Sequence, residues 1–192
     1  MFLPENPDST PLTPEESEAL IPAFIATRSD LNIAEQRNIL GAEQWAFRGR
    51  KDVLSEPFLR RLHHQMFREV WQWAGQYRKS ARNLGVEAWQ IHSLMAEMLN
   101  DVCFWIRDKI YPMDEIAVRF HHRLVWIHPF PNGNGRHARL TADLLLHQQG
   151  HPRFSWGQLN LQKPNAIRQR YIDALRAADD HDITPLLAFA RS

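Results

Sequence analysis

Apolar side chains recur at intervals of three and four residues along most of this chain. That spacing places them on one face of an α-helix, where they can pack into a core. The pattern predicts helices over residues 29–45, 57–73, 91–111, 114–127 and 136–148, and two closing helices over 165–178 and 183–190. The sequence therefore predicts an all-α fold.

Two stretches depart from the helical pattern. Residues 1–14 are rich in Pro, Asp, Ser and Thr, which is typical of an irregular arm, and a short helix is expected from Thr13-Pro14 to about Leu20. We therefore divide the chain into an N-terminal arm, 1–28, and one larger domain, 29–192. The segment 76–88 lacks helical periodicity and is bracketed by Gly75 and Gly85, which favours a β-hairpin or a loop.

Composition narrows the class of protein. The chain has 192 residues with 23 Lys and Arg against 22 Asp and Glu, so its net charge of +1 argues against nucleic acid as the main partner. Its one cysteine, Cys103, excludes an intrachain disulfide and fits a reducing compartment. The N-terminus lacks the pattern of a signal peptide, and no apolar run is long enough to cross a membrane. We expect a cytoplasmic protein without a membrane partner.

The segment HPFPNGNGRHAR, from His128 to Arg139, carries the candidate chemistry. Glycine lets a backbone approach a ligand closely, and the first amides of a helix are unpaired and partly positive. Glycines before a helix therefore predict an anion site suited to phosphate. Arg136 and Arg139 are three residues apart, so we expect both on one helical face, where they could clamp further phosphates.

His128 stands at the other end of the same segment. An imidazole titrates near neutrality and can take the proton of an attacking hydroxyl, which is what phosphoryl or nucleotidyl transfer needs beside a phosphate cradle. The other interpretation is structural, because a turn with a good helix start would also use these residues. The remaining histidines are interpreted as packing or surface groups, with His137 exposed.

The segment lacks the Gly-Lys-Ser/Thr of a Walker A loop and the GxGxxG of a dinucleotide site. It resembles the Fic family signature HxFx(D/E)GNGRxxR and departs from its fixed positions only at Asn132. The resemblance extends to LHHQMFREVWQWAGQYRKS, AVRFHHRLVWIHPF and RLTADLLL. LNIAEQRNIL and ALRAADDHDITPLLAFARS are similar to the small bacterial subfamily called mobile mystery protein B.

The resemblance implies a helical domain with a short β-hairpin flap that uses ATP and Mg²⁺ to place AMP on a Tyr, Thr or Ser hydroxyl of a target protein. It implies His128 as the base, and a possible antitoxin-like partner. The implied ATP-binding residues are Gly133, Asn134, Gly135, Arg136 and Arg139. The implied flap covers residues 78–86, with Lys79, Ser80, Ala81, Arg82 and Asn83 aligning the target by strand addition.

Asn132 stands where the family has an acidic metal ligand, and a neutral amide is a poorer ligand for Mg²⁺. Three outcomes follow: the phosphates hold Mg²⁺ and the enzyme is slower, another acid substitutes, or the chemistry differs. The alternatives to AMP transfer are phosphate transfer, as in the related Doc proteins, and a non-catalytic nucleotide-binding regulator. Doc-like motifs have Asn-Lys-Arg where this chain has Asn134-Gly135-Arg136, which favours AMP transfer.

Glu35 is a candidate inhibitory residue. Many Fic proteins are inhibited by a glutamate in the motif (S/T)xxxE(G/N), which pairs with the second arginine of the signature. This chain has Leu31 and Gln36 at the flanking positions, so only the glutamate is kept. Glu35 is either a solvated residue of an amphipathic helix or an inhibitory residue paired with Arg139.

Overall fold

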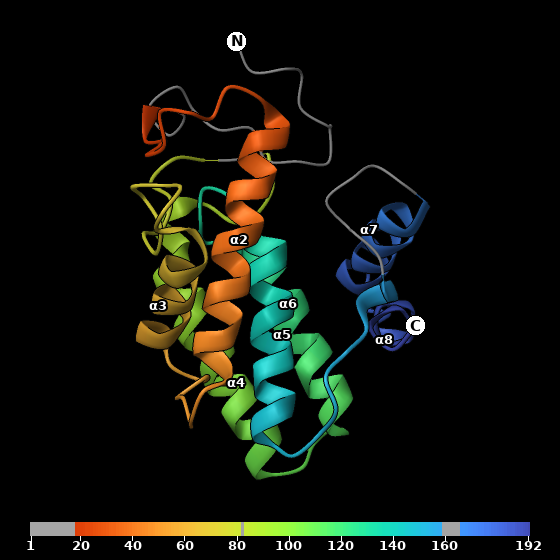
Figure 1. Ribbon diagram of the computed structural model, residues 1–192. Helices are drawn as coiled ribbons and strands as arrows, with labels where there is room; N and C mark the ends of the chain where they lie inside the picture. Colours follow the sequence, from red (N-terminus) through yellow and green to blue (C-terminus); the bar gives the residue numbers. More distant parts are fainter. Residues whose placement is uncertain (1–17, 82, 159–165) are drawn as a thin grey trace.

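The computed structural model describes residues 18–81, 83–158 and 166–192, and the named secondary-structure elements of that part are helices joined by loops. Figure 1 shows α2, α3, α4, α5 and α6 in one group, with α7 and α8 together beside it. The α-helices are α2 (Arg28–Phe47), α3 (Glu56–Phe67), α4 (Ile91–Arg107), α5 (Met113–Ile127), α6 (Asn134–Gln148), α7 (Ala166–Asp179) and α8 (Thr184–Ala190). Two short 3₁₀ helices are η1 (Ala88–Gln90) and η2 (Trp156–Gln158).

Local sequence signals set the starts of the first two helices. Thr27 caps α2 reciprocally with Asp30: the Asp30 amide donates to the Thr27 hydroxyl at 3.1 Å, and the Thr27 amide donates to the Asp30 carboxylate at 2.9 Å. Ser55 caps α3, whose first turn contains Pro57. The helices predicted near residues 29 and 57 are therefore confirmed, but Thr27 caps the first one, where the sequence suggested Ser29 or Asp30.

The helices α5 and α6 pack against each other and belong to two hydrophobic clusters. The larger cluster joins them to α2, α3 and α4 and contains fully buried side chains such as Leu62, Met66 and Trp71. The smaller cluster joins their other side to α7 and α8, around Leu146 and Leu186. This arrangement fixes the turn between α5 and α6 from both sides, because each helix is held by two cores.

Helix α3 ends earlier than the sequence predicted. The pattern indicated a helix to Trp73, but α3 ends at Phe67. Beyond it the backbone pairs with the segment before α2: the Ile21 amide donates to the Val70 carbonyl at 2.9 Å, and the Gln72 amide donates to the Ala19 carbonyl at 3.0 Å. These bonds use backbone groups that a continued helix would have paired internally.

The predicted β-hairpin of the flap is not seen in the described residues 78–81 and 83–86. The amides of Arg78 and Val86 donate instead to the carbonyls of Pro129, at 2.9 Å, and Ile127, at 3.4 Å. The Arg78 side chain donates to the carbonyls of Ser80 and Val86. Because these groups are engaged elsewhere, the flap forms a loop held against the α5–α6 turn.

Two further predictions concern the N-terminal arm and membrane spans. The N-terminal arm, residues 1–14, and most of its short helix lie outside the described residues, so the division at residue 28 stays a prediction. Within the described part, none of the helices combines the length and apolar character that a membrane span needs.

Candidate nucleotide site

The α5–α6 turn brings His128, Gly133 and the first turn of α6 together. Gly133 has a φ of 79° directly before α6, and a Cβ atom placed on it would lie 2.4 Å from Phe67 Cζ. Only glycine fits this position, because any larger residue would be both strained and in collision. Helix α6 then begins at Asn134, so its first amides face the end of the turn.

The turn is held rigidly from inside. The side chain of Asn134 accepts from the Phe130 amide at 2.9 Å and donates to the Phe130 carbonyl at 2.8 Å. The Phe130 ring is fully buried and stacks on His63, with 3.7 Å between ring centres. Asn134 can therefore contribute its backbone to a phosphate site, while its side chain is committed to the turn.

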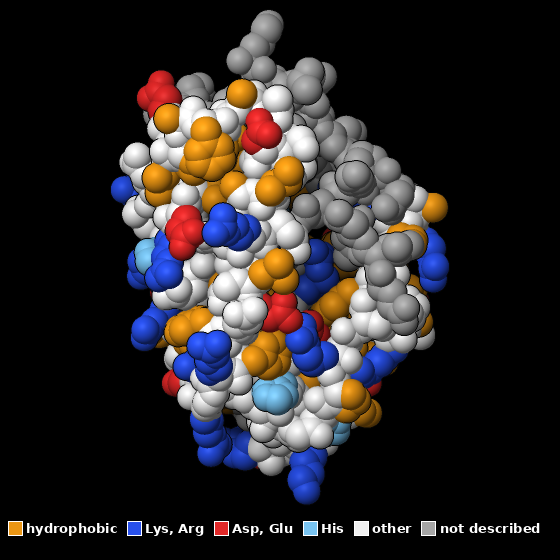
Figure 2. Space-filling model, viewed as in Figure 1, with side chains coloured by type: hydrophobic (Ala, Val, Ile, Leu, Met, Phe, Trp, Pro, Cys, Tyr) orange, Lys and Arg blue, Asp and Glu red, His pale blue; other side chains and the backbone are white. Residues whose placement is uncertain are grey.

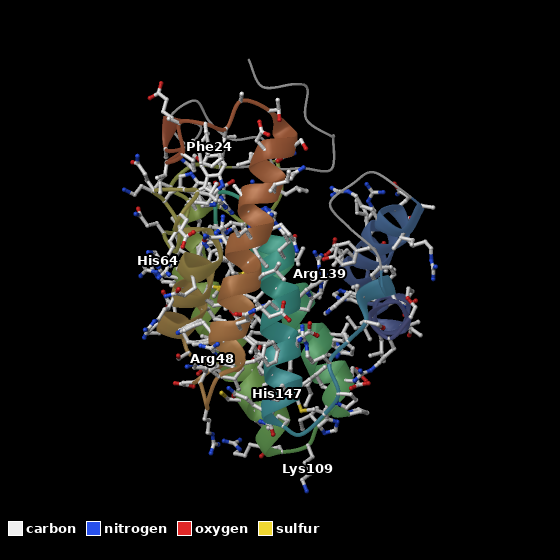
Figure 3. All side chains as sticks on the ribbon, viewed as in Figure 1. Phe24, Arg48, His64, Lys109, Arg139 and His147 are labelled. Carbon is white, nitrogen blue, oxygen red and sulfur yellow. The ribbon has the colours of Figure 1, made fainter. Side chains whose placement is uncertain are left out.

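His63 connects this turn to α3 and was not identified from the sequence. Its Nδ1 accepts from the Gly75 amide at 2.9 Å, so the ring proton lies on Nε2, which donates to the Asn132 carbonyl at 3.0 Å. Burial lowers the pKa of His63 well below its usual value, which keeps this ring neutral. The sequence alone does not show which histidine of the pair His63-His64 is buried. In the structure His63 is buried, whereas His64 is exposed on the outer side of α3 (Figure 3).

His128 occupies the residue directly after α5 in a left-handed conformation, with φ 54° and ψ 57°. Its Nδ1 lies 3.3 Å from the Val125 carbonyl. A carbonyl only accepts, so this contact places the proton of the neutral ring on Nδ1 and leaves Nε2 as the nitrogen that can take a proton. That tautomer is the one that a general base acting through Nε2 requires.

Glu35 of α2 reaches the start of α6. Its carboxylate is 3% exposed and accepts from Arg136 Nη1 at 2.6 Å and from Trp71 Nε1 at 2.7 Å. The interpretation of Glu35 as a solvated residue is therefore wrong, because the packing of α2 against α3 and α6 buries this position. The expected partner is also different: Glu35 pairs with the first arginine of the segment, Arg136, and not with Arg139.

Arg139 points toward α7 instead (Figure 3). Its guanidinium lies 5.5 Å from the centre of the Tyr171 ring. Burial raises the pKa of Tyr171, and the Arg139 charge and its hydrogen bond to the hydroxyl act in the opposite direction. The Tyr171 hydroxyl also lies 3.0 Å from His121 Nε2. The two arginines predicted on one face are thus held by different helices, Arg136 by α2 and Arg139 by α7.

Gly135 lies beside Arg139 and Tyr171. A Cβ atom built on Gly135 would lie 3.6 Å from Arg139 Nη1 and 3.8 Å from the Tyr171 hydroxyl. These are ordinary contact distances, so packing around this position does not itself require glycine. Figure 2 shows Lys and Arg side chains scattered among apolar and acidic ones on the visible face, including some in the recess beside α7 and α8.

His137, expected to be exposed, is buried. Its Nε2 lies 2.9 Å from the Leu59 carbonyl, and burial lowers the pKa of His137 to about 4. The cause is that α3 packs against α6 on this side. His137 is therefore neutral and donates a hydrogen bond from α6 to α3. It adds no positive charge to the surface.

The implied metal does not fit a site held by protein ligands alone. The Asn132 side-chain oxygen already accepts from the Gly133 amide at 2.6 Å. In the described part of the chain, no group of three or more His, Cys, Asp or Glu residues is arranged to hold a metal ion. Protein ligands for Mg²⁺ usually include at least one carboxylate. The side-chain oxygens of this turn are the neutral amide oxygens of Asn132 and Asn134, and both already accept from backbone amides.

The flap lies next to His128. Lys79, Ala81 and Asn83 are exposed and Ser80 is half-buried, while Arg82 lies outside the described residues. A Cβ atom on Gly85 would lie 2.4 Å from His128 Cβ, so the far end of the flap packs directly on the histidine. The structure brings the predicted base, the phosphate segment and the flap to one end of α5 and α6.

The chain is similar to known proteins over the segment that contains this site. Residues 53–146 match the family described as Fic/DOC. The protein adenylyltransferase Fic of Aedes aegypti is 30% identical over 118 residues, which cover 60% of this chain and 22% of that protein. This chain therefore matches less than a quarter of the length of that relative.

Solved structures agree. A Fic family protein from Desulfovibrio desulfuricans G20 has a TM-score of 0.63 and 26% identity, covering 93% of this chain and 56% of that one. The BepC protein from Bartonella tribocorum with bound AMPPNP has a TM-score of 0.69 and 17% identity, covering 93% and 97%. With the signature-bearing turn inside the matched segment, residues 53–146 of this chain are a Fic/DOC family domain.

Proposed function

We propose that this protein transfers AMP from ATP to a hydroxyl of a target protein. The observation that carries the proposal is the α5–α6 turn, which holds a proton-accepting histidine and an open helix start with two arginines within one segment. The similarity to relatives named protein adenylyltransferase supports the same reaction. Tyr, Thr and Ser are the candidate acceptors.

In the proposed reaction, His128 Nε2 takes the proton of the target hydroxyl. The hydroxyl oxygen forms a bond to the α-phosphorus of ATP, and the bond from that phosphorus to the bridging oxygen breaks, so pyrophosphate leaves. Amides at Gly133, Asn134 and Gly135 would hold negative charge on the phosphates. Arg136 and Arg139 would hold the β- and γ-phosphates. Mg²⁺ would enter with the nucleotide, because the described side chains do not form a site for it.

Glu35 supports a second part of the proposal, which concerns control of the same site. Its carboxylate occupies a donor of Arg136 that a phosphate would use. The nucleotide-free chain would therefore be restrained, and ATP would have to displace Glu35 before Arg136 could bind phosphate. An antitoxin-like partner, membership of the mobile mystery protein B subfamily and a cytoplasmic location stay predictions.

Labelled ATP separates the proposal from its alternatives. With ATP labelled at the α-phosphate, proteins of a cell lysate should gain label in the presence of this chain, whereas ATP labelled at the γ-phosphate should give none. Label from the γ-phosphate would indicate the Doc-like phosphate transfer. Nucleotide binding without either label would indicate a regulator that has lost catalysis.

A further inference from the structure

Arg78 is a buried cation at the base of the flap. Its residue is 3% exposed, and a guanidinium keeps its charge in proteins. An uncompensated buried charge costs several kcal/mol, so its donors need partners. Arg78 Nε donates to the His128 carbonyl at 2.7 Å, and Nη1 donates to the Ser80 carbonyl at 2.9 Å. Nη2 donates to the Val86 carbonyl and, at 3.4 Å, to the Ile127 carbonyl.

These four carbonyls belong to two structures that must meet during transfer. Those of Ile127 and His128 lie at the C-terminal end of α5, where carbonyls lack helical partners and carry partial negative charge. Those of Ser80 and Val86 lie toward the two ends of the flap. One planar guanidinium therefore joins both ends of the flap to the end of α5, which a point charge on a flexible stem could not do.

The contacts converge on the backbone of His128. A left-handed conformation costs a non-glycine residue about 1–2 kcal/mol, and it persists only where the surroundings impose it. Arg78 binds the carbonyl of His128 and the one before it, and the Arg78 amide donates to the carbonyl of Pro129, the residue after it, at 2.9 Å. Gly85 packs against the His128 side chain from the flap.

We propose that Arg78 is a positioning residue for group transfer, which fixes His128 and the target-aligning flap in one geometry. The role assigned to His128 rests on the proposed function, whereas the structural joint between the flap and α5 does not. The phosphate-binding amides and arginines begin at Gly133, beyond the contacts of Arg78. The proposal therefore separates two steps: Arg78 governs transfer to the target and not the binding of nucleotide.

The test is Arg78→Lys, which keeps the positive charge and loses the planar fork. The matched control is Arg119→Lys, because Arg119 forms a half-buried ion pair with Glu115 within α5 at 2.7 Å, away from the turn. Hydrogen exchange of the full chain gives the first readout. In Arg78→Lys, exchange should rise together in residues 76–87 and 127–130 and stay at the parent rate in α6. Unchanged exchange, or a rise spread evenly over α6 as well, would overturn the joint.

The second readout compares nucleotide binding with transfer. A displacement of reacting groups by about 1 Å can cost roughly 100-fold in rate, so labelling of lysate proteins from α-labelled ATP should slow at least ~10-fold in Arg78→Lys. Affinity for the non-hydrolysable analogue AMPPNP should match the parent. Equal loss of both would overturn the positioning role. If the parent itself transfers no label, the proposed function fails, and the exchange experiment still decides whether Arg78 joins the two segments.

Discussion

Replacing Glu35 by glutamine is the sharpest perturbation of the site. The carboxylate accepts from two donors, Trp71 Nε1 and Arg136 Nη1, at 2.7 and 2.6 Å. Glutamine has nearly the same shape but only one acceptor oxygen, so one of the two donors loses its partner. If the amide oxygen keeps Trp71, its NH₂ group faces the guanidinium, and Arg136 is released for phosphate.

The magnitude follows from the strength of that contact. A hydrogen bond to a charged group contributes about 1.5–3 kcal/mol, and 1.4 kcal/mol corresponds to a factor of ten, so affinity for AMPPNP should rise about 10-fold or more in Glu35→Gln. The same change removes one partner of a buried ion pair, in which Arg136 is 17% exposed. Breaking such a pair costs about 3–5 kcal/mol, so the nucleotide-free variant should melt at a lower temperature than the parent.

Calorimetric titration with AMPPNP and thermal unfolding without nucleotide measure the two effects. Glu115→Gln is the matched control, because it makes the same substitution in a half-buried pair with Arg119, away from the nucleotide site. Affinity for AMPPNP should stay at the parent value, and stability should fall less than at position 35. Higher affinity together with lower stability is expected only at position 35. Affinity that stays at the parent value or falls in Glu35→Gln would refute competition between Glu35 and phosphate.

Three further predictions follow from other contacts. Asn132→Asp should lower the Mg²⁺ concentration needed for half-maximal transfer, because an aspartate can still accept from the Gly133 amide and adds a charged oxygen; unchanged metal dependence would contradict this. Tyr171→Phe removes the hydrogen bond between Tyr171 and Arg139, which contributes about 1 kcal/mol, so ATP binding should weaken about fivefold. Because Arg139 is assigned to the γ-phosphate, ADP binding should stay unchanged. The pKa of His137 is lowered to about 4 from 6.5, so its contribution to stability is complete above pH 6.5 and is lost as pH falls toward 4. His137→Gln should therefore lose less unfolding free energy between pH 7 and pH 5 than the parent; equal losses would rule out this source.

The sequence predicted the helices well because their cores follow the helical period. The helix predicted over 136–148 after the glycine turn is confirmed by α6, which begins two residues earlier, at Asn134. Glycine and helix capping act between neighbours in the chain, so such signals are legible in sequence. The end of α3 could not be predicted from neighbouring residues, because it depends on backbone pairing with residues 19–21, far away along the chain.

The candidate site shows the same difference between signals from neighbouring residues and contacts with distant ones. The turn itself was found from its own residues, whereas its supports come from distant elements: His63 on α3, Tyr171 on α7 and Arg78 in the flap. A histidine pair or a lone tyrosine carries no local mark of such a role. Glycines and missing periodicity favoured a hairpin or a loop for the flap, and the family resemblance implied the hairpin. The local signals cannot distinguish strand pairing from a loop whose carbonyls accept from a buried arginine.

The central claim is that His128 acts as the base in AMP transfer to protein hydroxyls. The most direct measurement is mass spectrometry of lysate proteins incubated with ATP and either the parent chain or His128→Ala, with AMPPNP affinity measured for both. The account predicts AMP on Tyr, Thr or Ser side chains with the parent, none with His128→Ala, and equal nucleotide affinity. Equal AMP labelling by the parent and by His128→Ala, or no AMP-modified protein with the parent at all, would contradict it.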